Sequence, residues 1–154
     1  MKYSQFTLSN NIHCLFTSKK QSPISFINIT CKVGSKNEDK TNLGISHFLE
    51  HMLFKTTKKR STNKLLSDLD GQGALYNAMT TYEHTMYEIH GNKDTWKKLM
   101  DILLDLYLNP KLLKKDIEIE SVGKFLTTNL KAKIKEEALD LNLLKEKRQA
   151  KLPI

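Results

Sequence analysis

The chain has 154 residues, 39% of them hydrophobic and 27% charged, which is typical of one ordinary globular domain. No apolar run reaches the roughly 18 residues of a membrane span, and the first residues lack a signal-peptide core, so we expect a cytoplasmic protein without a membrane partner. The net charge of +8 is almost entirely lysine, because Arg60 and Arg148 are the only arginines. Arginine is the better bidentate reader of phosphates and bases, so a basic nucleic-acid-binding protein is only the third alternative, and we expect no nucleic-acid partner.

The first half of the chain predicts three strands followed by two helices. The strands cover residues 3–8, 12–17 and 24–33, and the last one stops at Gly34. After a polar loop, Asn42 is a suitable N-cap for a helix over 44–55. Ser61 can cap a second helix over 62–69, which Gly71 and Gly73 end.

The second half predicts two more strands and three more helices. The strands cover 74–79 and 82–90 and are joined by a short Thr80-Thr81 turn. Asn92 or Asp94 caps a long helix that Asn109-Pro110 stops, and two further helices are expected over 112–125 and 129–150. The order βββααββααα indicates an α+β domain, with helices packed on an antiparallel or mixed sheet.

The helix over 44–55 has two different faces. One is a buried apolar stripe at the spacing of helical neighbours, made of Ile45, Phe48, Leu49, Met52 and Leu53. His47, Glu50 and His51 gather on nearly the opposite side, because residues three and four apart are neighbours on a helix. Two imidazoles one turn apart can bind one metal ion, and a carboxylate between them can reach a water on that ion. The pattern therefore predicts a zinc peptidase site with His47 and His51 as metal ligands and Glu50 as the general base.

The order His-x-x-Glu-His is the inverzincin signature. Together with Gly34, Gly44 and the run Met52-x-Phe54-x-Thr56-Thr57, it closely resembles the zinc-site signature of the pitrilysin, insulin-degrading enzyme and mitochondrial processing peptidase family. The resemblance implies a zinc metalloendopeptidase acting on a peptide or protein substrate.

In that family an extended peptide adds to a sheet edge beside the zinc site, and strands after the zinc helix line the groove. Asn77, in the run Gly73-Ala74-Leu75-Tyr76-Asn77, holds the place of a family asparagine in the groove. Glu83, in the run Tyr82-Glu83-His84-Thr85, takes the place of a recurrent family glutamate on the next strand. The resemblance thus implies that Asn77 and Glu83 contact the substrate.

The family completes its zinc site with a glutamate on a later helix. Counting on from His51 reaches Thr127, where no carboxylate stands. The run Ile117-Glu118-Ile119-Glu120 resembles the start of the family's ligand-bearing segment, with Glu120 at an accessory glutamate. We predict Glu120 as the third metal ligand; a partner chain is another source, and the less favoured candidates are Glu118, Glu136 and Glu137.

The resemblance runs from about Tyr3 to Glu120. We predict a partial zinc-peptidase-like domain over 1–120 and a divergent helical tail over 121–154, whether the change near Ser121 is a truncation, a frameshift or a functional terminus. Active family members join two halves, so the chain resembles an incomplete N-terminal half, and a second family-like subunit is a candidate partner. The alternative to a peptidase is a catalytically inactive truncated relative that binds peptides or pairs with another subunit.

Overall fold

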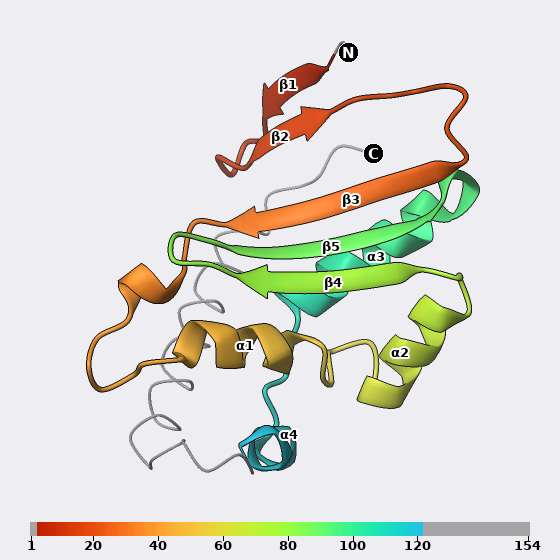
Figure 1. Ribbon diagram of the computed structural model, residues 1–154. Coiled ribbons are helices and arrows are strands. Elements are labelled where there is room, and N and C mark those ends of the chain that lie inside the picture. The colour runs from red at the N-terminus through yellow and green to blue at the C-terminus, as the bar shows by residue number, and fades with distance from the viewer. Residues whose placement is uncertain (1–2, 122–154) are drawn as a thin grey trace.

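The computed structural model describes residues 3–121, and their elements follow the predicted α+β order (Figure 1). In chain order these are β1 (Ser4–Thr7), β2 (His13–Phe16), β3 (Ile24–Cys31), the 3-10 turn η1 (Ser35–Asn37), α1 (Ile45–Leu53), α2 (Thr62–Asp70), β4 (Leu75–Thr80), β5 (Thr85–Asn92), the 3-10 turn η2 (Lys93–Thr95), α3 (Trp96–Leu108) and α4 (Lys114–Glu120). The helix predicted over 129–150 lies outside the described residues. Within residues 3–121 no helix has the length and apolar character needed to cross a membrane.

All described strands pair in an antiparallel manner. β1 and β2 form a separate hairpin, and β5 lies between β3 and β4 in a three-stranded sheet. The predicted two-residue turn between β4 and β5 is wrong, because β5 begins only at Thr85. The N–H and the hydroxyl of Thr81 both donate to the carbonyl of His84, at 2.8 and 2.9 Å, so residues 82–84 form the turn instead of strand.

One face of the three-stranded sheet carries the core. Tyr87 and Ile89 of β5 are buried on this face, where α3 covers the sheet with its apolar side (Figure 1). The buried cluster is completed by Leu53, Leu65, Leu69, Ala74, Leu99, Ile102, Leu103 and Leu106. The other face exposes the alternate side chains of the outer strands, which include Ile24, Phe26, Leu75 and Met79. The alternation of strand side chains thus produces one packed face and one open face.

The start of α1 differs from the sequence expectation. Gly44, not Asn42, is the N-cap, and it adopts the left-handed conformation with φ 87° that glycine tolerates. Asn42 is buried, and its side-chain oxygen accepts from the N–H of Asp39 at 2.6 Å. The carboxylate of Glu38 accepts from the N–H groups of Gly44 (2.7 Å) and Ser46 (2.9 Å). A carboxylate at the positive end of the helix therefore satisfies amides that the Gly44 cap, which has no side chain, cannot.

The caps of the other helices are closer to prediction. The hydroxyl of Ser61 accepts from the N–H of Lys64 at 3.3 Å, which confirms Ser61 as the cap of α2. Asn92 accepts from the N–H of Asp94 at 2.9 Å and so begins η2, while α3 itself starts at Trp96.

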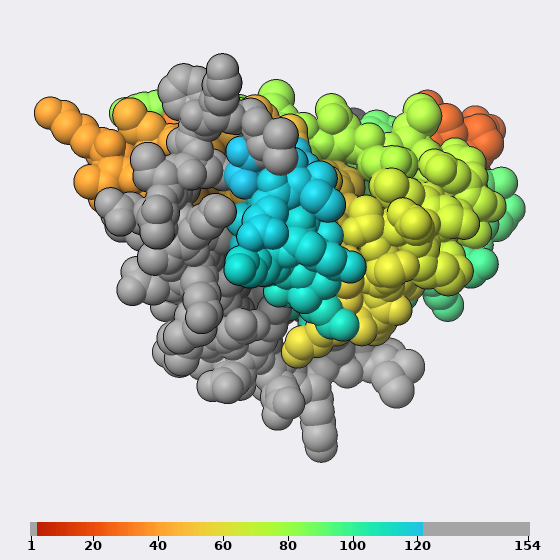
Figure 2. All heavy atoms as spheres, turned by 90° about the horizontal axis from the view of Figure 1, so that it is seen from below, coloured from red at the N-terminus to blue at the C-terminus, as the bar shows by residue number. Residues whose placement is uncertain are grey.

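The segment between α3 and α4 is attached to the segment that follows α1. Thr57 and Pro110 form an antiparallel bridge, flanked by hydrogen bonds from Lys58 N to Asn109 O and from Lys111 N to Thr56 O, both 2.9 Å. Figure 2 shows the blue-green surface of α4 and its preceding residues lying directly against the yellow surface of this segment. This attachment places α4 beside α1.

Candidate metal centre

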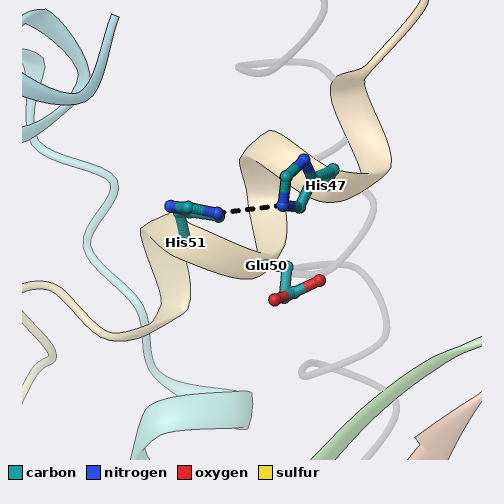
Figure 3. Close-up of side chains that lie close together, drawn as sticks. All are labelled: His47, Glu50 and His51. Carbon is teal, nitrogen blue, oxygen red and sulfur yellow. Dashed lines mark hydrogen bonds between the residues drawn. The ribbon is translucent and has the colours of Figure 1, made fainter. Parts of the chain in front are cut away.

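α1 runs along the edge strand β4, and His47, Glu50 and His51 project from it as a group (Figures 1 and 3). One ligand atom from each of the three lies within 4.8 Å of the others. The Nε2 atoms of His47 and His51 point at one another and are 3.0 Å apart. Two nitrogen ligands on a tetrahedral zinc ion are about 3.3 Å apart, so these two imidazoles fit a shared zinc ion with little adjustment.

The second ring nitrogen of His51 is held by α4. Its Nδ1 lies 2.8 Å from Oε1 of Glu120, whose Oε2 lies 2.7 Å from the ammonium of Lys55. The Lys55 ammonium, and after it His51, hold the pKa of the Glu120 carboxyl below its ordinary value. The carboxylate is therefore an anionic acceptor, which favours the His51 tautomer with its proton on Nδ1. That tautomer leaves the Nε2 lone pair free for a metal.

The sequence prediction made Glu120 a third metal ligand. Its contacts favour an orienting role instead, because both of its oxygens are engaged away from the Nε2 atoms of the two histidines. Glu118 is paired with Lys114 at 3.8 Å on the exposed side of α4. Thr127, Glu136 and Glu137 lie outside the described residues.

Glu50 differs from the two histidines in its burial. His47 and His51 are exposed, whereas Glu50 is only 9% exposed. Its Oε2 accepts a hydrogen bond from the hydroxyl of Thr80 at the end of β4. Thr80 was not among the predicted site residues, because the sequence predicts a turn at Thr80-Thr81, whereas β4 runs to Thr80. The available signal was the alternation of side chains along β4. Tyr76, Ala78 and Thr80 share one side of that strand, so a strand that continues to Thr80 places its hydroxyl on that side.

Two hollows of about 490 and 280 Å³ lie along β4, and Glu50 and Ala78 line both. The larger also contains His47 and extends past Thr80 to the β4–β5 turn. The smaller contains His51, Glu120 and Asn77, so Asn77 lies close to the candidate metal centre, and its contact with a substrate stays a prediction. Glu83 lies in the exposed turn, 3.1 Å from the ammonium of Lys36, and lines neither hollow.

A comparison with protein-family models matches residues 14–151 to the insulinase family, peptidase family M16. The matched range extends beyond Glu120, where the resemblance read from the sequence ends. The predicted boundary at residue 120 stays a prediction.

Similar proteins include an uncharacterized zinc protease of Mycobacterium bovis, 39% identical over 88 residues, which are 57% of this chain and 20% of that protein. The mitochondrial-processing peptidase subunit beta of Dictyostelium discoideum is 36% identical over 115 residues, 74% of this chain and 24% of that one. The crystal structure of a protease from Helicobacter pylori superposes with a TM-score of 0.73 and 25% identity, over 77% of this chain and 29% of that one. The chain thus spans about a fifth to a quarter of the length of these curated relatives. One of them is named a mitochondrial protein, and a cytoplasmic location stays a prediction.

Proposed function

Because the chain belongs to the insulinase family, peptidase family M16, we propose that it is a zinc metalloendopeptidase domain that hydrolyses peptide bonds. The observation that carries the proposal is the convergence of the Nε2 atoms of His47 and His51 at 3.0 Å, with the Glu50 carboxylate in the same group. The relatives named zinc protease and protease support the same reaction class.

Each residue of the group has a separate task. His47 and His51 would hold zinc through their Nε2 atoms, and Glu120 would orient the ring of His51 through Nδ1. When bound, zinc supplies a Lewis acid that polarises the scissile carbonyl and makes water easier to deprotonate. Glu50 accepts the proton of that water and passes it to the leaving amine. With Glu120 in the orienting role, the remaining protein ligand would have to come from a partner chain or from a residue after Ser121. The alternative is that Glu120 itself ligates the zinc, as the sequence predicted.

The edge of β4 is the proposed peptide-binding surface. β4 pairs with β5 on one side, and among residues 3–121 no strand pairs with its other side. A peptide that adds there as a strand passes Glu50, which lines the hollows at both ends of the edge. Asn77 is placed to contact such a peptide beside His51, and Glu83 would contact only its far end.

The test is the zinc content of the purified chain together with hydrolysis of a fluorogenic peptide. We expect close to one zinc per chain in the wild type and a large loss in His47→Ala, because one imidazole holds zinc weakly. Glu50→Gln should keep the zinc and lose hydrolysis by at least about a hundredfold, since it removes only the base. Wild-type zinc no higher than that of His47→Ala would refute the proposal.

A second candidate is a non-catalytic module that pairs with a complete subunit. The observation that favours it is that one relative is named as a subunit of a peptidase. This candidate predicts that Glu50→Gln changes neither partner affinity nor any measured activity. Zinc that is bound but supports no hydrolysis in the wild type would favour it over the peptidase.

A further inference from the structure

A general base works only if its carboxylate is held in one orientation, and Glu50 has a long side chain on a helix. We propose that Thr80 is the positioning residue for this base: its hydroxyl fixes one oxygen of the Glu50 carboxylate, so that the other is presented to the reacting water. The inference rests on the proposed peptidase function and adds a residue to its machinery. It is carried by the hydrogen bond from Thr80 Oγ1 to Glu50 Oε2 and by the low exposure of Glu50.

Thr80 stands on a rigid part of the fold. It is the last residue of β4 and lies opposite Thr85, whose buried hydroxyl donates to the carbonyl of Val33 at 2.9 Å. The next residue, Thr81, closes the turn to His84 with its N–H and its hydroxyl. A hydroxyl at this position therefore has a defined place relative to α1.

A second set of contacts holds the turn from outside. The N–H of Ser35 donates to Thr81 O at 3.1 Å, and that of Lys36 donates to Tyr82 O at 2.9 Å. Gly34 lies so close that a Cβ there would be 2.7 Å from Tyr82 O. The turn that follows Thr80 is thus held by backbone contacts from η1 as well as by its own hydrogen bonds, which gives the functional site the support that it needs.

The hydroxyl, rather than the shape of the side chain, is what Glu50 uses. Tyr76 and Ala78 share the α1-facing side of β4, and Tyr76 meets Phe54 of the segment after α1, with ring centroids 5.8 Å apart. Thr80 continues this row at the level of the carboxylate. Valine has the same branched shape as threonine but no hydroxyl. In Thr80→Val the Glu50 carboxylate, which is 9% exposed, would therefore lose its hydrogen-bond donor and remain incompletely solvated.

The matched variants Thr80→Val and Thr80→Ser therefore separate the effect of the hydroxyl on kcat from the effect of the side-chain shape. Loss of a hydrogen bond to a charged group corresponds to a decrease of about tenfold to a hundredfold in kcat, and KM should change little. Thr80→Ser keeps the donor and should recover most of kcat. Neither variant should alter the zinc content, because Thr80 touches the base and not the two histidines.

The experiment measures kcat and KM on a fluorogenic peptide, the zinc content, and the ¹³C resonance of the Glu50 carboxyl group. That resonance is assigned by its absence from Glu50→Gln. Thr30→Val is the control, because Thr30 is exposed on the open face of the same sheet, where its hydroxyl donates to the side chain of Asn28. We expect Thr80→Val to shift the resonance and lower kcat, while Thr80→Ser and Thr30→Val stay close to the wild type.

The outcomes separate this inference from the proposed function. An unshifted Glu50 resonance in Thr80→Val overturns the positioning role, whatever the activity. A shifted resonance with unchanged kcat overturns it too, because the contact would then have no consequence for the base. If the wild type binds zinc and hydrolyses nothing, the proposed function fails, and the resonance alone decides whether Thr80 orients Glu50. Equal loss of kcat in Thr80→Val and Thr80→Ser would assign the effect to packing and overturn the role of the hydroxyl.

Discussion

At the scale of single residues, neighbours decide what Glu120 does. A glutamate near a His-x-x-Glu-His helix can ligate a metal or can orient a ligand, and both roles need an anion. Glu120 lies 2.8 Å from Nδ1 of His51 and is also engaged by Lys55, so its carboxylate faces the rear of the ring. This geometry favours orientation, and substitution can distinguish the two roles.

Glu120→Gln and Glu120→Ala should differ in zinc affinity. Glutamine keeps an oxygen that can accept from Nδ1 of His51, so we expect a loss of less than about tenfold. Alanine removes the acceptor, and loss of such an orienting partner typically weakens metal binding by about tenfold to a hundredfold. Competition with a chromophoric chelator measures both affinities. Two equally severe losses would instead make Glu120 a direct ligand, as the sequence suggested.

At the scale of elements, α1 is useful because other segments fix it. The Glu38 carboxylate holds its first turn, and β4 and α4 lie along its sides. η1 in turn anchors the β4–β5 turn, through the close approach of Gly34 to the backbone at Thr81, Tyr82 and His84. Gly34 has φ −154°, an extended conformation that any residue adopts, so only the lack of space requires glycine here.

Gly34→Ala should destabilise the chain by about 2–3 kcal/mol, because its methyl group would meet backbone atoms that cannot move without breaking the turn. Gly91→Ala is the matched control: its methyl group would meet the end of the Leu99 side chain, which can rotate, and we expect about 1 kcal/mol or less. Urea unfolding followed by circular dichroism gives both values. Similar midpoints for the two variants would contradict this account of Gly34.

At the scale of the whole molecule, a charged cluster around Arg60 joins α2, α3 and the segment after α1. The guanidinium contacts Asp68 of α2 at 3.1 Å and, on α3, Asp101 at 2.6 Å and Asp105 at 2.8 Å. Asp105 is 1% exposed and also accepts from the hydroxyl of Thr57 at 2.6 Å. Because Thr57 bridges to Pro110, this cluster also fixes the path that leads to α4 and Glu120.

The cluster predicts a loss of stability in acid. Lys59, and then Arg60, lower the pKa of Asp101 below its ordinary value of 3.8, so its contribution to stability is complete above that value. The contribution disappears as the pH falls through the lowered value of the folded state. We expect the urea midpoint to decrease as the pH falls below about 4, as the paired carboxylates take up protons.

Asp101→Asn should reduce this acid-induced decrease, because it removes one of the titrating groups. Glu83→Gln is a suitable control, since Glu83 is an exposed partner in a surface ion pair. Urea unfolding at several pH values measures the slope for each variant. Identical slopes in the wild type and Asp101→Asn would show that the Asp101 pairs do not stabilise the fold.

The sequence by itself determined the order of the described elements and the grouping of three polar side chains on α1. Helical spacing places the apolar stripe on one face and brings His47, Glu50 and His51 together, whatever surrounds the helix. The predicted turn between β4 and β5 was wrong because the turn depends on contacts with residues distant in the chain, such as Ser35 with Thr81. The predicted cap of α1 was wrong because the carboxylate of Glu38, in the preceding loop, accepts from the first amides of the helix. Local propensity contains no information about such contacts.

Only the tertiary structure decided what surrounds the three residues. It sets Thr80 against Glu50 and Glu120 against His51, pairs separated by 30 and 69 positions in the chain. It also places Glu83 in an exposed turn, whereas the resemblance had implied a position on a strand of the groove. The physical reason is that helix periodicity fixes neighbours only within one element. Contacts between elements depend on how the sheet, α1 and α4 pack together.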